Sequence, residues 1–429
     1  MDKYLLAVLL VSIVIYGFFY NSFSAVLFDE STYMLAAKAI VEGKGYTMWI
    51  LAPLFSYIVA AFYFVFGSTE SVAKLVAPVF SVGSAVAMYY FSREFFDKKL
   101  SAASAIVLIT IPGLMVLGER VMTEAPYMFF FILSLLFFIR AAKGNNSYLV
   151  PLAVTFVSIF LIKYSGVLLL PVFLLYFIVR KDYEGLKRLV LSKWMVLAII
   201  VAFVTMIPMF LYSQQLFGNP LQLFLVSFST YNIQPDEPWY FYIQNFPIIA
   251  AATLPFLLYG SYVAIRKKPE YLWLVASVLF LFLYKLLFLA VRETRYLIDI
   301  LPFAVIISSL AFASLRFDRK LLVALFCAVI LTDMAIGIYA IDKVANDPKY
   351  TDMEVASVWV KENCKDPVLS NMGGPLKYYT GFDSGGISDD AIQNATYDCI
   401  VYNKQVSSIT VLDDITPTEI FGDVLIFKK

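Results

Sequence analysis

Histidine is absent from this chain of 429 residues. Its absence excludes catalytic triads that use histidine as the base, histidine-ligated metal sites and histidine proton relays. Charged residues are also scarce, at 15% of the chain, and they nearly balance to a net charge of +1. The chain therefore has no basic segment of the kind that binds nucleic acid.

Hydrophobic residues take the place of the missing charge. They make up 61% of the chain, aromatic residues reach 17%, and the mean hydropathy is +0.78. A soluble domain has roughly 45–50% apolar and about 25% charged residues. The sequence therefore predicts an all-α polytopic membrane protein with aromatic residues at the ends of its apolar runs.

Eleven apolar runs are predicted to span the membrane. They cover residues 4–20, 72–92, 100–117, 124–142, 148–163, 165–180, 194–212, 246–265, 271–290, 297–315 and 321–341. The first is interpreted as an uncleaved anchor, because no clear cleavage site follows it. A further run, Ile50 to Phe66, is ambiguous, because it has only about 17 residues and contains Pro53 near its start.

The distribution of Lys and Arg decides how this ambiguous run is interpreted. Within residues 1–341, most Lys and Arg residues lie in the loops 93–99, 140–147, 180–193, 266–270 and 316–320. If residues 50–66 do not cross, all these loops lie on the cytoplasmic side, as the positive-inside rule requires; if they crossed, the bias would invert. We therefore predict a half-inserted or surface-lying helix at 50–66, a cytoplasmic N-terminus and an extracytoplasmic C-terminus.

The composition changes after Ile341. Residues 342–429 are polar and combine a charged helix-like stretch with short β-type runs. We predict that these residues form a small extracytoplasmic α/β domain. Residues 1–341 are predicted to form a transmembrane catalytic domain. Its first outer loop, 21–71, is predicted to contain juxtamembrane helices. Cys364 and Cys399 lie on the side where a disulfide can persist, but the sequence does not report their distance. The glycosylation sequon at residues 394–396 lies on the same side.

Charged residues at the outer membrane face form the candidate site. Asp29 and Glu30 follow the first span and open an amphipathic stretch. The other charged residues that this topology places there are Glu119, Arg120, Glu124, Lys163, Lys285, Arg292, Glu293 and Arg295. Charges at a bilayer are costly to desolvate and often functional. Together they fit a reaction in which cations hold an anionic, membrane-bound substrate and a carboxylate takes a proton.

Each of these residues also has a structural interpretation. Asp29 can cap a helix that begins near Ser31, and Glu124 can pair with Arg120 on a helix surface. Lys163 can extend to the membrane interface, and Arg292 and Arg295 can anchor a helix end. For the cations, this interpretation is at least as strong as the functional one.

Short motifs occur in a fixed order along the chain. After Asp29-Glu30 come Pro53-Leu54-Phe55-Ser56-Tyr57, Arg120-x3-Glu124, Lys163-Tyr164 and Arg295-Tyr296-x5-Pro302. With these motifs, residues 1–315 resemble the GT-C glycosyltransferases, specifically the group of protein O-mannosyltransferases and aminoarabinose lipid A transferases. The resemblance implies a membrane glycosyltransferase on the outer face that moves mannose or another hexose or pentose from a polyprenyl-phosphate carrier, with inversion. Its acceptor would be a hydroxyl of a protein, lipid or glycan.

The resemblance assigns roles by motif. Asp29 resembles the group's catalytic base and Glu30 its partner, while Glu124 stands where the group usually has Asp. Leu51 replaces the lysine of the Lys-Pro-Pro-Leu motif of lipid A transferases, and the Trp-Trp-Asp run of oligosaccharyltransferases is absent. Residues predicted to bind the carrier phosphate or the acceptor are Arg120, Lys163, Tyr164, Arg292, Arg295 and Tyr296. No cofactor is predicted, and a requirement for a divalent metal stays open.

Two other functions compete with the transferase. A polytopic lipid or sugar flippase or transporter usually carries ionisable groups near the bilayer midplane and paired repeats. Here most charges lie at the outer rim and the sequence shows no repeat. A non-catalytic relative whose outer domain binds a partner would have no need of the Asp29-Glu30 pair. The sequence therefore favours the transferase.

Overall fold

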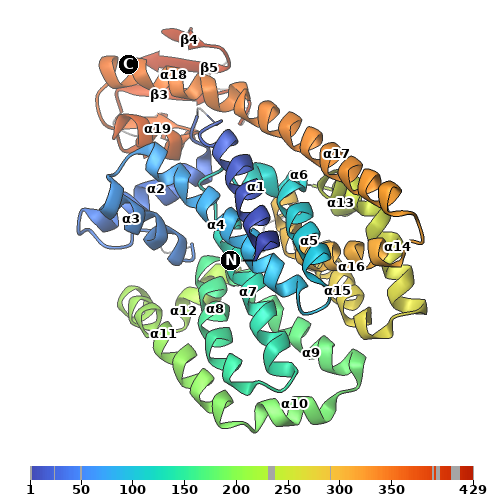
Figure 1. Cartoon of the computed structure of the whole chain (residues 1–429). Helices are drawn as coiled ribbons and strands as arrows, with labels where there is room; N and C mark the ends of the chain where they lie inside the picture. The colour runs from blue at the N-terminus through green and yellow to red at the C-terminus, as the bar shows by residue number, and fades with distance from the viewer. Residues whose placement is uncertain are drawn as a thin grey trace.

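The computed structural model of the chain describes residues 2–23, 25–48, 51–229, 237–289, 291–388, 391–392, 397–406 and 416–428. The described part is mostly helical, with a small sheet near the C-terminus (Figure 1). The sequon at 394–396 lies outside the described residues.

The helical part of the chain agrees with the predicted polytopic membrane fold. Helical stretches long and apolar enough to cross a membrane are Glu70–Ser92, Glu124–Ala142, Lys193–Phe217, Phe241–Arg266, Pro269–Phe288, Thr294–Ser314 and Arg319–Asn363. Shorter apolar helices are Lys3–Phe19, Leu54–Phe66, Asn146–Ile162 and Tyr164–Arg180. Ten of the eleven predicted spans overlap these stretches, whereas the predicted span 100–117 falls on two shorter helices, Lys98–Thr110 and Pro112–Leu117. The predicted all-α membrane architecture is confirmed.

The helices of the first half are α1 (Lys3–Phe19), α2 (Phe28–Val41), α3 (Leu54–Phe66), α4 (Glu70–Ser92), α5 (Lys98–Thr110), α6 (Pro112–Leu117), α7 (Glu124–Ala142), α8 (Leu149–Ile162), α9 (Leu169–Arg180), α10 (Tyr183–Val190) and α11 (Lys193–Phe217). Those that follow are α12 (Gln222–Ser229), α13 (Phe241–Ala250), α14 (Leu254–Arg266), α15 (Leu272–Phe288), α16 (Leu301–Ser314), α17 (Arg319–Ala345), α18 (Pro348–Asn363) and α19 (Gly373–Thr380).

Helices α2 and α3 lie in the predicted first outer loop. Helix α2 begins at Phe28 rather than near Ser31, so Asp29 sits in its first turn and is not its N-cap, contrary to the structural interpretation of the sequence. Helix α3 has 13 residues, about 20 Å at 1.5 Å per residue, whereas the hydrocarbon core is about 30 Å thick. Helix α9, which belongs to a predicted span, has only 12 residues, so length alone does not set α3 apart. That α3 does not cross stays a prediction, as does the orientation of the chain.

Two apolar runs are interrupted rather than continuous. Helices α5 and α6 separate at Ile111, which takes an extended ψ of 128° because it precedes Pro112. Helices α13 and α14 separate at Ala251, where φ is +42°. There Asp333 of α17 accepts hydrogen bonds from the Ala252 N–H (2.8 Å) and the Thr253 hydroxyl (2.9 Å). This buried carboxylate satisfies donors that the break exposes.

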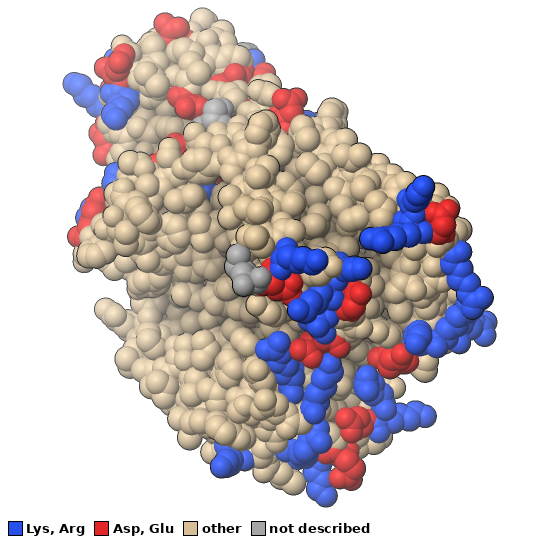
Figure 2. Space-filling view, in the orientation of Figure 1, with Lys and Arg blue, Asp and Glu red and all other residues tan. Residues whose placement is uncertain are grey.

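The loops rich in Lys and Arg gather at one end of the helical body. Glu94 accepts hydrogen bonds from Arg140 (2.9 Å) and Lys143 (2.8 Å), and Asp2 pairs with Lys98 (3.1 Å). Figure 2 shows Lys and Arg concentrated toward α10 and the α14–α15 turn, away from the C-terminal sheet, with a wide band of little charge between. This division is the one that the predicted topology requires.

The C-terminal part forms the predicted small α/β domain. Its strands are β1 (Val368–Ser370), β2 (Ser384–Gly385), β3 (Cys399–Asn403), β4 (Glu419–Phe421) and β5 (Val424–Lys428), in the order β2-β1-β3-β5-β4. Strand β1 is parallel to β2 and β3, whereas β5 is antiparallel to β3 and β4. A disulfide joins Cys364 and Cys399, whose Cα atoms are 6.0 Å apart. Because α17 continues to Ala345, a boundary at 341/342 would fall within a helix and stays a prediction.

This domain contacts the helix that carries Asp29. The Val26 N–H, just before α2, donates a hydrogen bond to the Tyr379 hydroxyl of α19 over 2.8 Å. A Cβ built on Gly374 would lie 2.7 Å from the Ser31 hydroxyl oxygen, so a larger residue there would force the Ser31 side chain to move. The first turn of α2 is therefore held from the side of the sheet domain (Figure 1).

Candidate active site

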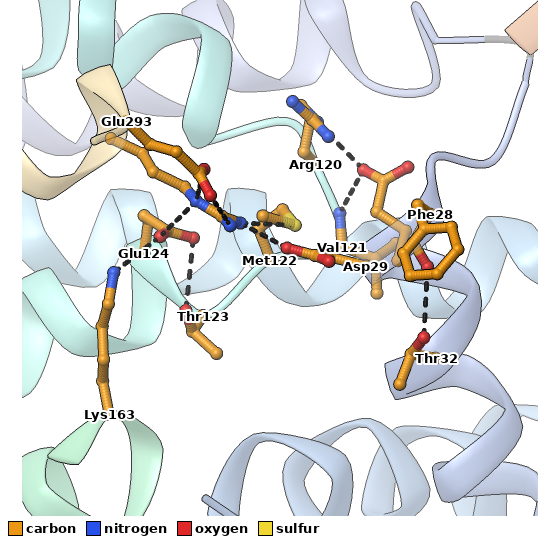
Figure 3. A network of polar contacts seen from close by, with 12 residues as sticks. Phe28, Asp29, Thr32, Arg120, Val121, Met122, Thr123, Glu124, Lys163 and Glu293 are labelled. Carbon is orange, nitrogen blue, oxygen red and sulfur yellow. Dashed lines mark hydrogen bonds and ion pairs between the residues drawn. The ribbon is translucent and has the colours of Figure 1, made fainter. Parts of the chain in front are cut away.

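Arg295 is the centre of an ionic cluster. It lies in the short 3₁₀ helix Thr294–Ile300 that leads into α16. Its Nη1 donates to Asp29 Oδ2 over 2.6 Å, its Nη2 donates to Glu293 Oε1 over 2.9 Å, and its Nε lies 3.9 Å from Glu124 Oε1. Figure 3 shows Asp29, Glu124 and Glu293 converging on one point from different elements. One cation thus joins three segments that are distant in sequence.

Glu124 is fully buried at the first position of α7. It accepts a hydrogen bond from Lys163 Nζ over 3.0 Å, so its cation partner is Lys163 and not Arg120. A carboxylate is favourable at this helix N-terminus. The Tyr296 ring lies 4.4 Å from Lys163 Nζ and 5.6 Å from the Arg295 guanidinium carbon. Tyr296 therefore stabilises both predicted phosphate-binding cations through cation–π contacts.

Glu30 and Asp29 have very different surroundings although they are neighbours. Glu30 is 2% exposed; its Oε1 accepts from Arg120 Nε (3.2 Å) and the Val121 N–H (3.1 Å), and its Oε2 accepts from the Leu27 N–H (2.8 Å). It fastens the first turn of α2 to the segment between α6 and α7. The Asp29 side chain is 41% exposed, so of the pair it is the accessible carboxylate.

Three cavities share Arg295 as a wall residue. The large cavity, of about 610 Å³, extends from Asp29 and Arg120 between α6, α13 and α17 to Lys349 and Tyr350 of α18. The lysine cavity, of about 170 Å³, is lined by Lys163, Lys285, Tyr296 and Asp299, with apolar residues of α15. The central cavity, of about 80 Å³, is lined by Asp29, Glu124, Lys163, Tyr164 and Tyr296. The ionic cluster therefore stands where three cavities meet.

Most predicted site residues meet here, but Arg292 does not. Arg292 donates a hydrogen bond to the Glu237 carbonyl and, among the described residues, is not part of the wall of any of the three cavities. The sequence missed the pairing of Lys285 with Asp299 (2.7 Å) in the lysine cavity. The available signal was that each charge interrupts a long apolar run, which in membrane proteins marks functional positions.

Glu119 also lies outside the cluster. It is 2% exposed, and neither carboxylate oxygen has a hydrogen-bond partner within the described ranges. Burial raises the pKa of Glu119 to about 9, because the charged form is poorly solvated. Glu119 is therefore protonated at neutral pH and has no role as a base in the cluster.

Comparisons with known proteins match this architecture. Residues 51–212 match the family model described as dolichyl-phosphate-mannose-protein mannosyltransferase. The fold is similar to the crystal structure of ArnT from Cupriavidus metallidurans bound to undecaprenyl phosphate, with a TM-score of 0.78 and 12% identity over 99% of this chain and 97% of that chain. The apo Archaeoglobus fulgidus oligosaccharyltransferase matches with a TM-score of 0.60 and 13% identity, over 90% of this chain and 64% of that chain.

A curated relative matches a shorter segment. Mouse GPI alpha-1,2-mannosyltransferase 3 is 26% identical over 157 residues, which cover 33% of this chain and 27% of that protein. The chain thus spans about a quarter of that relative's length. The fold is similar to that of ArnT, and the resemblance to the mannosyltransferase and ArnT group is confirmed. The segment that matches the family model contains Glu124 and Lys163 but neither Asp29 nor Arg295.

Proposed function

We propose that this protein is an inverting membrane glycosyltransferase that moves a sugar from a polyprenyl-phosphate carrier to a hydroxyl acceptor. The observation that carries the proposal is the accessible Asp29 carboxylate, held 2.6 Å from Arg295 where three cavities meet. The family match and the likeness to a protein that binds undecaprenyl phosphate support a lipid-linked donor.

Asp29 is the general base of the proposed reaction. The acceptor oxygen attacks the anomeric carbon, the bond from that carbon to the phosphate oxygen breaks, and the phosphate leaves with the electron pair. The hydroxyl proton passes to Asp29. A carboxylate is a weak base toward an alcohol, so the proton moves late, as the new bond forms. The carrier phosphate is already a good leaving group, so the reaction needs no general acid.

We propose that the carrier phosphate binds in the lysine cavity. Lys163 and Arg295 line it, and charge-assisted hydrogen bonds from such side chains are the usual means of holding a phosphate. The carboxylates that pair with these two cations, Asp29 and Glu124, line the neighbouring central cavity instead. The proposed phosphate position and the proposed base thus lie in two neighbouring cavities that share Arg295 as a wall residue.

The large cavity is the proposed acceptor site. Apolar residues of α6, α13 and α17 form one wall, while Arg120, Lys349 and Tyr350 contribute polar groups. This combination fits an acceptor with both apolar and polar parts, which reaches Asp29 with its hydroxyl. Whether that acceptor is a protein, a lipid or a glycan stays open.

We propose further that the cluster and residues 342–429 face the extracytoplasmic side, with the N-terminus in the cytoplasm. Asp2 and the basic loops lie together at the opposite end from the sheet domain, which supports this orientation.

A metal role finds little support in the donor groups. Within the described residues, the group with metal-ligand spacing is Cys364, Asp398 and Cys399, and both cysteines are in the disulfide.

The proposal is tested by comparing lipid-linked sugars and glycans, by mass spectrometry, in cells with and without the protein. Purified protein in lipid vesicles is then given polyprenyl-phosphate sugars, with loss of donor and gain of glycosylated acceptor as the readout. We expect a donor to accumulate in cells without the protein and to be consumed by the purified protein. Unchanged lipid-linked sugars and glycans, together with no consumption of hexosyl or pentosyl donors, would refute the proposal.

A further inference from the structure

A second buried ion pair lies in the lysine cavity, between two residues that have not been assigned a role so far. Lys285 of α15 donates from Nζ to Asp299 Oδ2 over 2.7 Å, and the two side chains are only 3% and 5% exposed. The other oxygen, Asp299 Oδ1, is buried and has no hydrogen-bond partner in the part of the chain that the structure describes. A buried pair with a purely structural role needs its remaining lone pairs satisfied. Among the described residues, Asp299 therefore lacks one of the hydrogen-bond partners that a purely structural pair would have.

The charges around the lysine cavity favour an anion. Its wall contains three cations, Lys163, Lys285 and Arg295, and one carboxylate, Asp299. The cavity has about 170 Å³, which is room for roughly a dozen water-sized groups. One phosphodiester group fits in such a space within reach of several walls. Lys163 and Arg295 are shared with carboxylates of the central cavity, so Lys285 is the cation committed to this cavity alone.

We infer that Lys285 is a ligand of the carrier phosphate, and that Asp299 is a positioning residue that holds the Lys285 ammonium at the cavity wall. The inference rests on the proposed function for the identity of the phosphate as that of a polyprenyl carrier. An ammonium has three donors, and its bond to Asp299 uses one of them. The other donors are available for phosphate oxygens, so Lys285 binds the phosphate without leaving Asp299. The apolar side chains of Phe288 and Leu289 line the same cavity and extend it for the first isoprene units.

The test measures binding of polyprenyl phosphate and of the matching polyprenol, which lacks the phosphate, to the full chain in lipid nanodiscs. For Lys285→Gln we expect the Kd of polyprenyl phosphate to rise about 10–100-fold, the usual range for a lost charged hydrogen bond. The Kd of polyprenol should not change. Asp299→Asn keeps an oxygen for Lys285 and should change the polyprenyl-phosphate Kd less than about threefold.

Lys74→Gln is the matched control. Lys74 is also a buried lysine (3% exposed) with a carboxylate partner, Glu70, but it lines none of the three cavities. It should leave the phosphate-dependent difference in affinity unchanged. Because Lys285→Gln alone disrupts a buried pair, the double variant K285Q/D299N, which removes both charges, is measured as well. It should unfold at a temperature closer to that of the native protein and still show the loss of phosphate binding.

The outcomes distinguish a Lys285 that binds phosphate from a Lys285 that acts only in packing. Equal losses for polyprenyl phosphate and polyprenol, or recovery of phosphate binding in K285Q/D299N, would show that Lys285 acts only in packing and would overturn the inference. Equal losses in Lys285→Gln and Asp299→Asn would overturn it too, because a structural pair depends on both partners alike. Phosphate-dependent binding through Lys285 without transfer from any glycosylated donor would leave the inference standing and refute the proposed function.

Discussion

The substitution Asp29→Asn tests whether Asp29 acts as the base, because it leaves the other side chains of the ionic cluster unchanged. The change keeps the size and hydrogen-bonding shape of the side chain and removes its charge. Loss of a general base lowers turnover by about 10²–10⁴-fold, which corresponds to about 2.7–5.4 kcal/mol of transition-state stabilisation at 1.36 kcal/mol per factor of ten. We therefore expect kcat to fall in that range.

The structure also limits the effect of this change on stability. The Asp29 side chain is 41% exposed and its partner Arg295 keeps Glu293, so the lost pair is worth only about 0–1 kcal/mol. The unfolding temperature should change by only a few degrees. Donor KM should change little, because Asp29 does not line the lysine cavity.

The assay is transfer from a polyprenyl-phosphate sugar by purified protein in vesicles, with unfolding followed on the same samples. Asp383→Asn is the control, because Asp383 also forms a 2.6 Å ion pair, with Lys377, but on the surface of the sheet domain. It should leave kcat unchanged. Near-normal kcat in folded Asp29→Asn protein would refute the assignment of the base.

The remaining predictions concern the phosphate, the topology and a buried acid. Arg295→Ala should raise donor KM at least tenfold, whereas Arg266→Ala, at the opposite end, should not; equal effects on both variants would contradict the phosphate role. With Cys327 replaced and the native disulfide kept, a cysteine at Ser68 should react with an impermeant thiol reagent in intact cells and one at Glu184 only after lysis; the reverse pattern would mean that residues 50–66 span the bilayer. Burial raises the pKa of Glu119 to about 9 while an unfolded Glu titrates near 4.3, so the native protein loses stability as pH rises between these values. Glu119→Gln should therefore unfold at a higher temperature than the native protein at pH 8 but at nearly the same temperature at pH 5; an equal difference at both pH values would refute the buried, neutral carboxyl.

The start of helix α2 could not be predicted from the sequence. The sequence placed a helix after Asp29-Glu30 but began it near Ser31, whereas α2 begins at Phe28. The cause is Glu30, which accepts from the Leu27 N–H and from a segment some ninety residues away. That tertiary contact fixes the first turn, and no local pattern reports it.

Membrane class, the approximate extents of the apolar segments and the small C-terminal domain followed from the sequence alone. Each depends on properties that adjacent residues carry: the length of an apolar run, the density of charge and the change to a polar composition after Ile341. The order of the Asp29-Glu30, Lys163-Tyr164 and Arg295-Tyr296 motifs likewise indicated the fold and most of the candidate site. These signals need no knowledge of which segments touch.

Only the tertiary structure decided which charges meet. In the structure Glu124 pairs with Lys163, and Glu30 accepts a hydrogen bond from Arg120. Arg292 donates to the Glu237 carbonyl, and Lys285 pairs with Asp299. These outcomes depend on distances of a few ångströms between side chains on different helices, because charge–charge and hydrogen-bond energies fall off steeply with separation. The sequence named the charged groups at the membrane surface, and the packing of the helices determined which of them share a cavity.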